Sequence, residues 1–184
     1  MNWIFILQCF YFFLPAYFAN MTPTFAWRAK VLEFLAKPID FGRKHQGFPI
    51  FGSHKTWRGI ILGVLMGILV TWIQRILSNF PFFAKLSFFD YQEINIFLLG
   101  FLLSFGALIG DAVGSFFKRR QGIEPGRSWI PFDQMSFVIG SFVVTAPFFK
   151  IPILAWICIL FLSFVLHIIV NRIGFWLGIN KSRI

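Results

Sequence analysis

Long apolar stretches separated by short polar segments make up most of this chain. A helix that crosses a bilayer needs about 20 mostly apolar residues. Five stretches approach that length, at approximately residues 3–19, 59–76, 94–117, 135–149 and 152–170. The first lacks the basic start of a secretory signal peptide, so it is counted among the helices. The pattern predicts an all-α, polytopic membrane protein with five transmembrane helices.

The lengths and spacing of these segments indicate how they pack. The second and fourth are short in strictly apolar length, which is tolerable where helix ends face protein rather than lipid. Only residues 150–152 separate the fourth from the fifth, so these two form a tight hairpin. We expect one domain over residues 1–184. Glycines that recur every fourth residue allow close backbone approach in lipid: Gly59, Gly63 and Gly67, then Gly106, Gly110 and Gly114.

Basic residues are distributed unevenly among the polar segments. Of the 17 lysines and arginines, all but Arg75, Lys85 and Lys150 fall in three places: the loop before the second helix, the loop after the third, and the C-terminal tail. Loops rich in lysine and arginine remain in the cytoplasm. We therefore expect a multi-pass protein of the cell membrane, with its N-terminus outside, its C-terminus in the cytoplasm and its active site facing the cytoplasm.

Composition narrows the classes of function. Hydrophobic residues make up 58% of the 184 residues, whereas soluble domains contain about 45–50%. The net charge of +10 fits nucleic acid, anionic lipid or a phosphorylated substrate. Because the charge lies in loops between apolar spans, no nucleic acid partner is expected. Cys9 and Cys158 lie in apolar spans, where packing explains them better than a disulfide or a metal pair.

The third apolar segment ends in a polar face. Asp111, Ser115 and Lys118 are spaced four and three residues apart, so they share one face of a helix near its cytoplasmic end. A carboxylate inside a membrane is costly and is a candidate functional group. Asp111 is either half of a structural ion pair, with Lys118 or a neighbouring basic residue, or a ligand of Mg²⁺, which prefers hard oxygen donors.

A second acidic residue, Asp133, stands at the start of the fourth helix. It is either the N-cap of that helix, a position that favours aspartate, or a second metal ligand. The second alternative arises because Asp111 and Asp133 bracket one short loop, so their helix ends can lie side by side. Lys118, Arg119 and Arg120 begin this cationic loop. A metal site beside such a loop suits a triphosphate, because lysine and arginine neutralise the charge that develops at phosphorus.

The segment FGSHKTWRG, just before the second helix, is a further candidate phosphate site. A Gly-Ser turn precedes Lys55, Thr56 and Arg58, which supply donors, and the helix adds backbone N–H groups and the positive end of its dipole. The general excess of basic residues in cytoplasmic loops explains each charge singly. It does not explain a turn, a hydroxyl and two bases within seven residues. His54 is either a phosphate donor or an ordinary loop histidine.

Four motifs, LPAYFAN, KPIDFG, GSHKTWRG and GDAVGSFFKRRQGIEPGRSWIPFDQ, occur in this order. Together they resemble the CDP-archaeol synthase family, membrane relatives of CDP-diacylglycerol synthases. The resemblance spans nearly the whole chain, and the last motif is the most specific. One departure is His54, where the family pattern has a small residue. The resemblance implies five transmembrane helices and transfer of CMP from CTP to a lipid phosphate, with pyrophosphate release and Mg²⁺ as cofactor.

The resemblance also implies roles for individual positions. The expected partners are CTP, a lipid phosphate of the archaeol type or a related glycerol lipid, and membrane lipids, in phospholipid synthesis. The residues expected to be catalytic are Asp111, Lys118, Arg119 and Asp133. Those expected to bind nucleotide or phosphate are Lys55, Thr56, Arg58 and Ser115, and the two expected to bind Mg²⁺ are Asp111 and Asp133. Independently of the resemblance, we also expect Arg120 of the basic cluster to bind nucleotide or phosphate.

Three other functions compete with this one. A transporter of anions or phosphate compounds would use the same basic pocket, but it would need polar residues strung through several helices, and here they gather at the cytoplasmic ends. A phosphotransferase that uses a CDP-alcohol would carry a denser array of aspartates. The third alternative is a membrane scaffold without catalytic activity. Only the clustering of the polar residues argues against it.

Overall fold

The computed structural model describes residues 2–45, 47–124 and 129–176 of the chain. Five long helices carry the apolar segments: α1 (Trp3–Arg28), α2 (Trp57–Leu77), α4 (Ile96–Arg120), α5 (Phe132–Thr145) and α6 (Ile153–Trp176). Smaller elements lie in the connections. These are the 3-10 helix η1 (Glu33–Leu35), the strands β1 (Lys44–His45) and β2 (Phe48–Pro49), and the short helix α3 (Pro81–Lys85).

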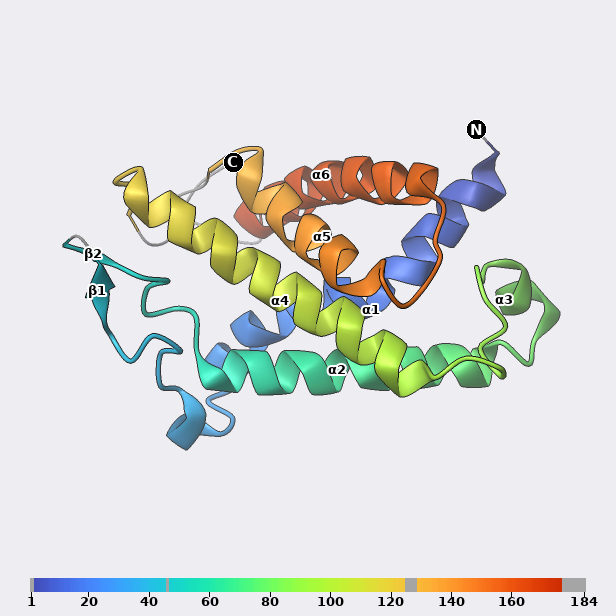
Figure 1. Cartoon of the computed structure of the whole chain (residues 1–184), viewed down its shortest axis with the longest axis horizontal. Coiled ribbons are helices and arrows are strands. Elements are labelled where there is room, and N and C mark those ends of the chain that lie inside the picture. The colour runs from blue at the N-terminus through green and yellow to red at the C-terminus, as the bar shows by residue number, and fades with distance from the viewer. Residues whose placement is uncertain (1, 46, 125–128, 177–184) are drawn as a thin grey trace.

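Successive long helices run in opposite directions along the bundle (Figure 1). The antiparallel hairpin of β1 and β2 lies at the same end of the bundle as the start of α2, the end of α4 and the start of α5. We call this the hairpin end. α3 and the start of α1 lie at the opposite end. The alternation therefore brings the two basic segments, which are far apart in the sequence, to one end of the molecule.

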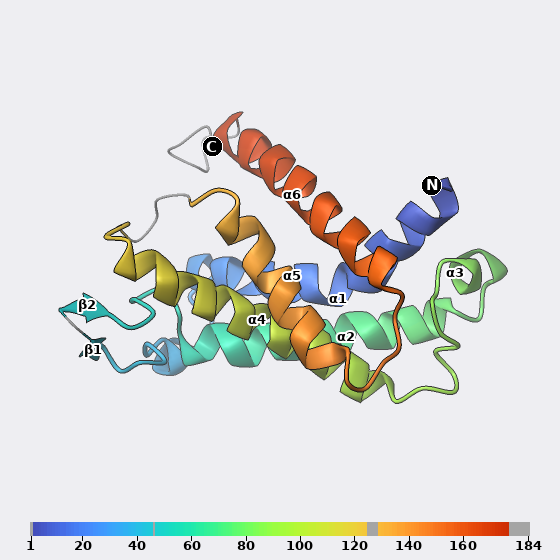
Figure 2. The same cartoon turned by 45° about the horizontal axis from the view of Figure 1, so that its top comes forward.

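Three of the described helices, α1, α2 and α4, are long and apolar enough to cross a membrane. α5 and the apolar part of α6, Ile153–Ile169, are shorter. α4 is central and packs against α1, α2 and α5, whereas α6 packs against α5 and α1 and leans away from α2 (Figure 2). The prediction of a mostly helical protein with several membrane-length apolar helices is confirmed.

The first helix is longer than predicted, because α1 continues beyond residue 19 to Arg28. Pro23 lies inside this extension without ending it, and the hydroxyl of Thr22 donates to the carbonyl of Phe18 at 2.7 Å. Two further polar residues, Asn20 and Thr24, line a pocket instead of facing lipid. The helix therefore extends beyond the apolar stretch that marked it in the sequence.

The predicted glycine rows are contact surfaces between helices. A Cβ atom on Gly110 of α4 would lie 2.2 Å from the carbonyl oxygen of Ser136 in α5, and one on Gly140 would lie 2.5 Å from the Cα atom of Gly110. A Cβ atom on Gly67 of α2 would lie 2.4 Å from the Cβ atom of Ser104. The helix backbones touch at these points, as small residues permit in membrane bundles.

Aromatic side chains fill the core between α1 and α6. Phe12 and Phe13 pack edge-on against Trp156, with ring centroids 5.9 and 6.1 Å apart. Such edge-to-face pairs stabilise a core beyond the area that they bury. Cys9 and Cys158 are buried in the same cluster as free thiols, in agreement with the packing role predicted for them.

The crossing of α4 and α5 yields a stability prediction. Gly110→Ala and Gly140→Ala should each lower the free energy of unfolding by about 2 kcal/mol or more, because overpacking costs about 1–3 kcal/mol and the atoms in the way belong to a backbone. Gly59→Ala is the control, since its Cβ atom would lie 3.1 Å from Pro23. Denaturant titration in detergent micelles measures all three. Similar losses for control and crossing variants would contradict the close contact.

Candidate active site

The loop between α1 and α2 folds around one buried carboxylate. Asp40 is 7% exposed, and its oxygens accept hydrogen bonds from the backbone N–H groups of Gly42 at 2.9 Å, Phe51 at 2.9 Å and Gly52 at 3.2 Å. Gly52 has a φ of +96°, which side chains disfavour. Burial alone would raise the pKa of Asp40, but the N–H donors outweigh burial and hold the pKa below its ordinary value.

The same loop fixes the start of α2. The backbone N–H of Ile39 donates to the carbonyl of Lys55 at 2.9 Å, and Thr56 pairs with Pro38 across an antiparallel bridge. The hydroxyl of Thr56 caps α2 by accepting from the N–H of Gly59 at 3.2 Å. Lys55 is therefore held immediately before a helix N-terminus, and its side chain reaches α4.

Two lysine–aspartate pairs join the segments that carry the predicted site. Lys55 donates to the carboxylate of Asp111 in α4, and Lys118 at the end of α4 donates to the carboxylate of Asp133 in α5. The two carboxylate side chains are 30% and 26% exposed, so both remain accessible to a ligand. Asp111 is thus ion-paired, but to the first loop and not to Lys118 of its own helix.

Asp133 does not occupy the N-cap of α5, so that interpretation is wrong. The N-cap is Pro131, and Asp133 lies in the first turn of the helix. Its carboxylate accepts a hydrogen bond from the backbone N–H of Trp129 at 2.8 Å, in addition to the one from Lys118. Asp133 therefore links Trp129, just before α5, and Lys118, near the end of α4, to the first turn of α5.

Two basic side chains at the end of α4 are buried. Lys118 is 6% exposed and Arg119 is 7% exposed. Arg119 donates from Nη1 to the carbonyl of Ile123, whereas its Nε is buried and has no hydrogen-bond partner among the described residues. A Cβ atom on Gly52 would lie 3.7 Å from this Nε. Arg119 thus brings an unused donor beside the turn of the first loop.

Two other residues of α4 were expected to bind phosphate, Arg120 and Ser115. Arg120 donates to the carbonyls of Pro49 and Ile50 at 3.2 and 3.3 Å, and its guanidinium lies 3.5 Å above the centre of the Phe116 ring. These contacts hold the hairpin against α4, while Nη2 of Arg120 is buried without a hydrogen-bond partner among the described residues. Ser115 is half-buried, one turn beyond Asp111.

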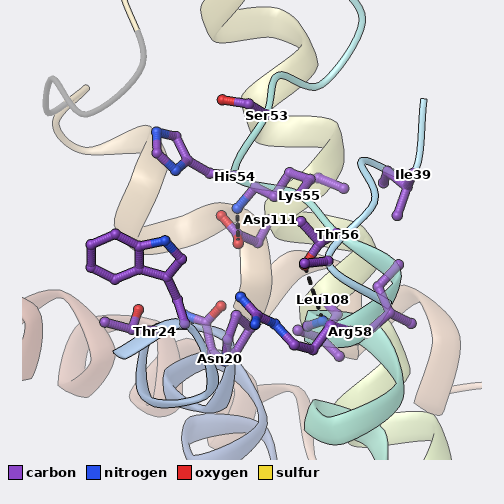
Figure 3. Close-up of a pocket in the computed structure, with 16 residues that line it drawn as sticks. Asn20, Thr24, Ile39, Ser53, His54, Lys55, Thr56, Arg58, Leu108 and Asp111 are labelled. Atoms are coloured by element: carbon purple, nitrogen blue, oxygen red, sulfur yellow. Dashed lines mark hydrogen bonds and ion pairs between the residues drawn. The ribbon is translucent and has the colours of Figure 1, made fainter. Parts of the chain in front are cut away.

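A cavity of about 620 Å³ lies between α1, the first loop, α2 and α4 (Figure 3). We call it the main pocket. The ion pair of Lys55 and Asp111 stands on its wall, and Arg58 reaches across it toward Asn20. The polar side chains that line it are Asn20, Thr24, Ser53, His54, Lys55, Thr56, Arg58 and Asp111.

The sequence reasoning missed Asn20 and Thr24 as part of the site. These residues are four positions apart, so they lie on one face of α1 and both reach the main pocket. A polar pair at helical spacing, directly after an apolar span, is the signal that would have found them. The structure therefore adds α1 to the walls formed by the first loop and α4.

Each carboxylate of the predicted pair has its own lysine partner, Lys55 for Asp111 and Lys118 for Asp133. Asp111 lines the main pocket, whereas Lys118 and Asp133 do not. Among the described residues, no group of three or more histidines, cysteines, aspartates or glutamates is placed to hold a metal ion. Mg²⁺ is usually bound by one or two carboxylates together with water and substrate phosphates. The donor set therefore fits Mg²⁺ only in company with a phosphorylated ligand.

Comparison with known proteins decides the family. The model of the CarS-like CDP-archaeol synthase family matches residues 2–183, almost the whole chain. The chain belongs to the CDP-archaeol synthase family. This membership confirms the resemblance carried by the four motifs.

The CDP-archaeol synthase family includes close relatives of similar length. The CDP-archaeol synthase of Pyrococcus furiosus is 40% identical over 148 residues, which cover 80% of this chain and 79% of the relative. That of Methanocaldococcus jannaschii is 37% identical over 171 residues, which cover 92% of each chain. A solved structure of an intramembrane enzyme for archaeal membrane lipid biosynthesis is 28% identical, with a TM-score of 0.67, covering 90% of this chain and 94% of that one.

The Asp40 cluster of this CDP-archaeol synthase family member yields a pH prediction. Asp40→Asn turns an amide toward N–H donors, so near pH 7 we expect a loss of about 1–3 kcal/mol of stability. Because the pKa of Asp40 is lower in the folded state, its carboxylate stabilises fully above the unfolded-state pKa, and this contribution disappears as pH falls through the folded-state pKa. The difference in Tm between the two proteins should therefore stay constant near neutrality and shrink in acid. A Tm difference that does not change with pH would contradict the stabilising role of the Asp40 carboxylate.

Proposed function

We propose that this chain transfers CMP from CTP to the phosphate of a membrane lipid, of the archaeol type or a related glycerol lipid, and releases pyrophosphate. Membership of the CDP-archaeol synthase family over residues 2–183 carries the proposal. The ion pair of Lys55 and Asp111 on the wall of the main pocket supports it, because a nucleotide with a divalent cation needs both signs of charge side by side. The transporter alternative has no support from the family match.

The reaction requires positioning and charge neutralisation more than covalent chemistry from the protein. An oxygen of the lipid phosphate attacks the α-phosphorus of CTP and forms a new P–O bond. The bond from this phosphorus to the oxygen that bridges it to the β-phosphorus breaks, and pyrophosphate leaves with the electron pair. A phosphate monoester is an anion at neutral pH, so the attack needs no dedicated general base.

Lys55, Lys118 and Arg119 are the residues that stabilise the departing pyrophosphate in this proposal. Each lysine is neutralised by an aspartate in the structure, and Arg119 has a buried Nε without a partner among the described residues. Triphosphate oxygens are stronger acceptors for such donors than neutral groups are. Donors already positioned around the developing charge lower the barrier, because they need little reorganisation. The hydroxyls of Thr56 and Ser115 are further donors to phosphate.

Asp111 and Asp133 are the residues that would hold Mg²⁺. Both carboxylates are partly exposed, and each is paired with the ammonium group of a lysine. A positive charge is therefore favourable beside both carboxylates. Bound Mg²⁺ would supply charge neutralisation on the phosphate oxygens. With the carboxylates occupied in this way, Lys55 and Lys118 are released to donate to the nucleotide.

The proposed arrangement in the membrane places all five long helices across the bilayer, with the N-terminus outside and the site facing the cytoplasm. The basic loops gather at the hairpin end, whereas α3, which ends in Lys85, lies at the opposite end (Figure 1). This distribution matches the retention of basic loops in the cytoplasm. The tail, residues 177–184, lies outside the described residues.

The reaction yields a prediction for the two acidic residues. Asp111→Asn and Asp133→Asn should each reduce lipid-dependent pyrophosphate release from CTP by about a hundredfold or more, because each removes a charge placed for the transition state. Each variant should also need more Mg²⁺ for half-maximal rate. Asp90→Asn is the matched control, since Asp90 is an exposed acid in the connection between α3 and α4.

Purified protein, labelled CTP, Mg²⁺ and a panel of lipid phosphates suffice for this measurement. Near-normal turnover in Asp111→Asn would remove Asp111 from the reaction. Pyrophosphate release that does not depend on the lipid would contradict the proposed function itself. Circular dichroism of each variant in detergent establishes that the fold is retained.

The membrane arrangement yields a second prediction, for labelling of introduced cysteines. A cysteine at position 85 should react with an impermeant maleimide added outside intact cells, and one at position 44 should react only after the membrane is opened. Cys9 and Cys158 are first replaced by alanine, because both are free thiols that could also react with the maleimide. Labelling of position 44 from outside would overturn the orientation.

A further inference from the structure

A second pocket adjoins the main pocket. It has a volume of about 590 Å³ and lies where α1 ends and the first loop begins. We call it the side pocket. Its lining consists of Trp27, Arg28, Lys30, Glu33, Ala36 and Arg58, and three of these residues, Trp27, Ala36 and Arg58, also line the main pocket. The two pockets therefore share one wall, and Arg58 is the charged residue among the three that they have in common.

The side pocket is basic. Arg28, Lys30 and Arg58 line it against one carboxylate, that of Glu33, so an anion is favoured there. Arg28 and Lys30 are exposed, whereas Arg58 is only 5% exposed. A guanidinium buried at the boundary between two pockets presents planar donors that match the oxygens of a phosphate.

The chain that forms the side pocket turns sharply after α1. Lys30 and Leu32 have φ values of +52° and +49°, which are strained for residues with side chains. Between them, the carbonyl of Val31 accepts a hydrogen bond from Nη1 of Arg58 at 3.2 Å. Strained backbone persists where surrounding contacts hold it and is frequent at binding sites. Here the strained turn places Lys30 and Arg58 on one pocket.

The segment that forms the side pocket also carries exposed aromatic side chains, and one of them, Trp27, lines the pocket. Phe25, Trp27 and Phe34 are mostly exposed, and all three belong to the segment that contains the pocket. Tryptophan is enriched at the membrane–water interface. A pocket with basic residues and an exposed tryptophan in its lining matches a ligand whose phosphate is attached to apolar chains.

We propose that the side pocket is the docking site for the phosphate of the lipid substrate. Arg28 and Lys30 receive the phosphate at the membrane surface, and Arg58 binds it at the boundary with the main pocket, where the nucleotide lies. This inference rests on the proposed function. It also answers a physical difficulty of the reaction, because lipid phosphate and CTP are both anions and repel each other. A cation in the shared wall offsets that repulsion where the two substrates approach.

The test uses paired neutralisations in the same loop. Arg28→Gln with Lys30→Gln removes two charges from the side pocket, and Arg43→Gln with Lys44→Gln removes two exposed charges that line neither pocket. Turnover is measured in neutral detergent micelles at varied mole fraction of lipid phosphate. The first variant should raise the KM for the lipid about tenfold, with the KM for CTP within about twofold of normal. The second variant should change neither.

Glu33→Gln tests the sign of the electrostatic effect. Removal of this carboxylate should lower the KM for the lipid by about twofold, since an exposed charge contributes little but here opposes the phosphate. Arg58 is left intact in these experiments, because its bond to Val31 also holds the turn.

A binding measurement separates this inference from the proposed function. Native mass spectrometry without CTP would use a dialkylglycerol phosphate as the probe and the matching phosphoglycerol diester as a general anionic lipid. We expect the wild type to retain the monoester better than the diester, and the Arg28/Lys30 variant to lose that preference.

Several outcomes would overturn the docking site. They are equal retention of both lipids, an equal rise in lipid KM in the Arg43/Lys44 variant, or a rise in the KM for CTP instead of the lipid. Wild-type protein that retains the monoester but releases no pyrophosphate would contradict the proposed function and leave the binding result in place.

Discussion

The direct contact between the backbones of α4 and α5 is the constraint on which the site depends. No Cβ atom fits at Gly106, Gly110 or Gly140, so the two helices cross at one point and cannot slide past each other. Asp111 follows Gly110 directly, and Asp133 lies seven residues, about two turns, before Gly140. The packing that stabilises the bundle in lipid thereby also fixes the two carboxylates relative to each other.

The burial of the two ion pairs suits a site that exchanges partners. A fully desolvated ion pair is costly to form and very costly to break. An exposed ion pair contributes little to stability and does little to fix the positions of its side chains. The side chains of Lys55 and Asp111 are 24% and 30% exposed, and Lys118 is buried against a partly exposed Asp133. Each carboxylate therefore positions its lysine and stays within reach of a ligand.

Much of the fold followed from the sequence, because apolar length and the placement of basic residues are strong signals in a membrane protein. The helices and the approach of the two basic segments were predicted in this way. The partner of Asp111 was not, because Lys118 lies seven residues away on the same helix, about 10 Å along its axis, and other segments compete for it. Asp40 was not recognised as the centre of the loop, since its hydrogen-bond donors lie up to 12 positions away.

The wall shared by the two pockets has a thermodynamic consequence. The guanidinium of Arg58 lies between the main pocket and the side pocket. An anion in either pocket changes the field that an anion in the other one meets, so occupancy of the two is linked. By reciprocity, each ligand alters the affinity for the other by the same factor. In the proposed arrangement, the single arginine in the shared wall therefore couples binding in the two pockets thermodynamically.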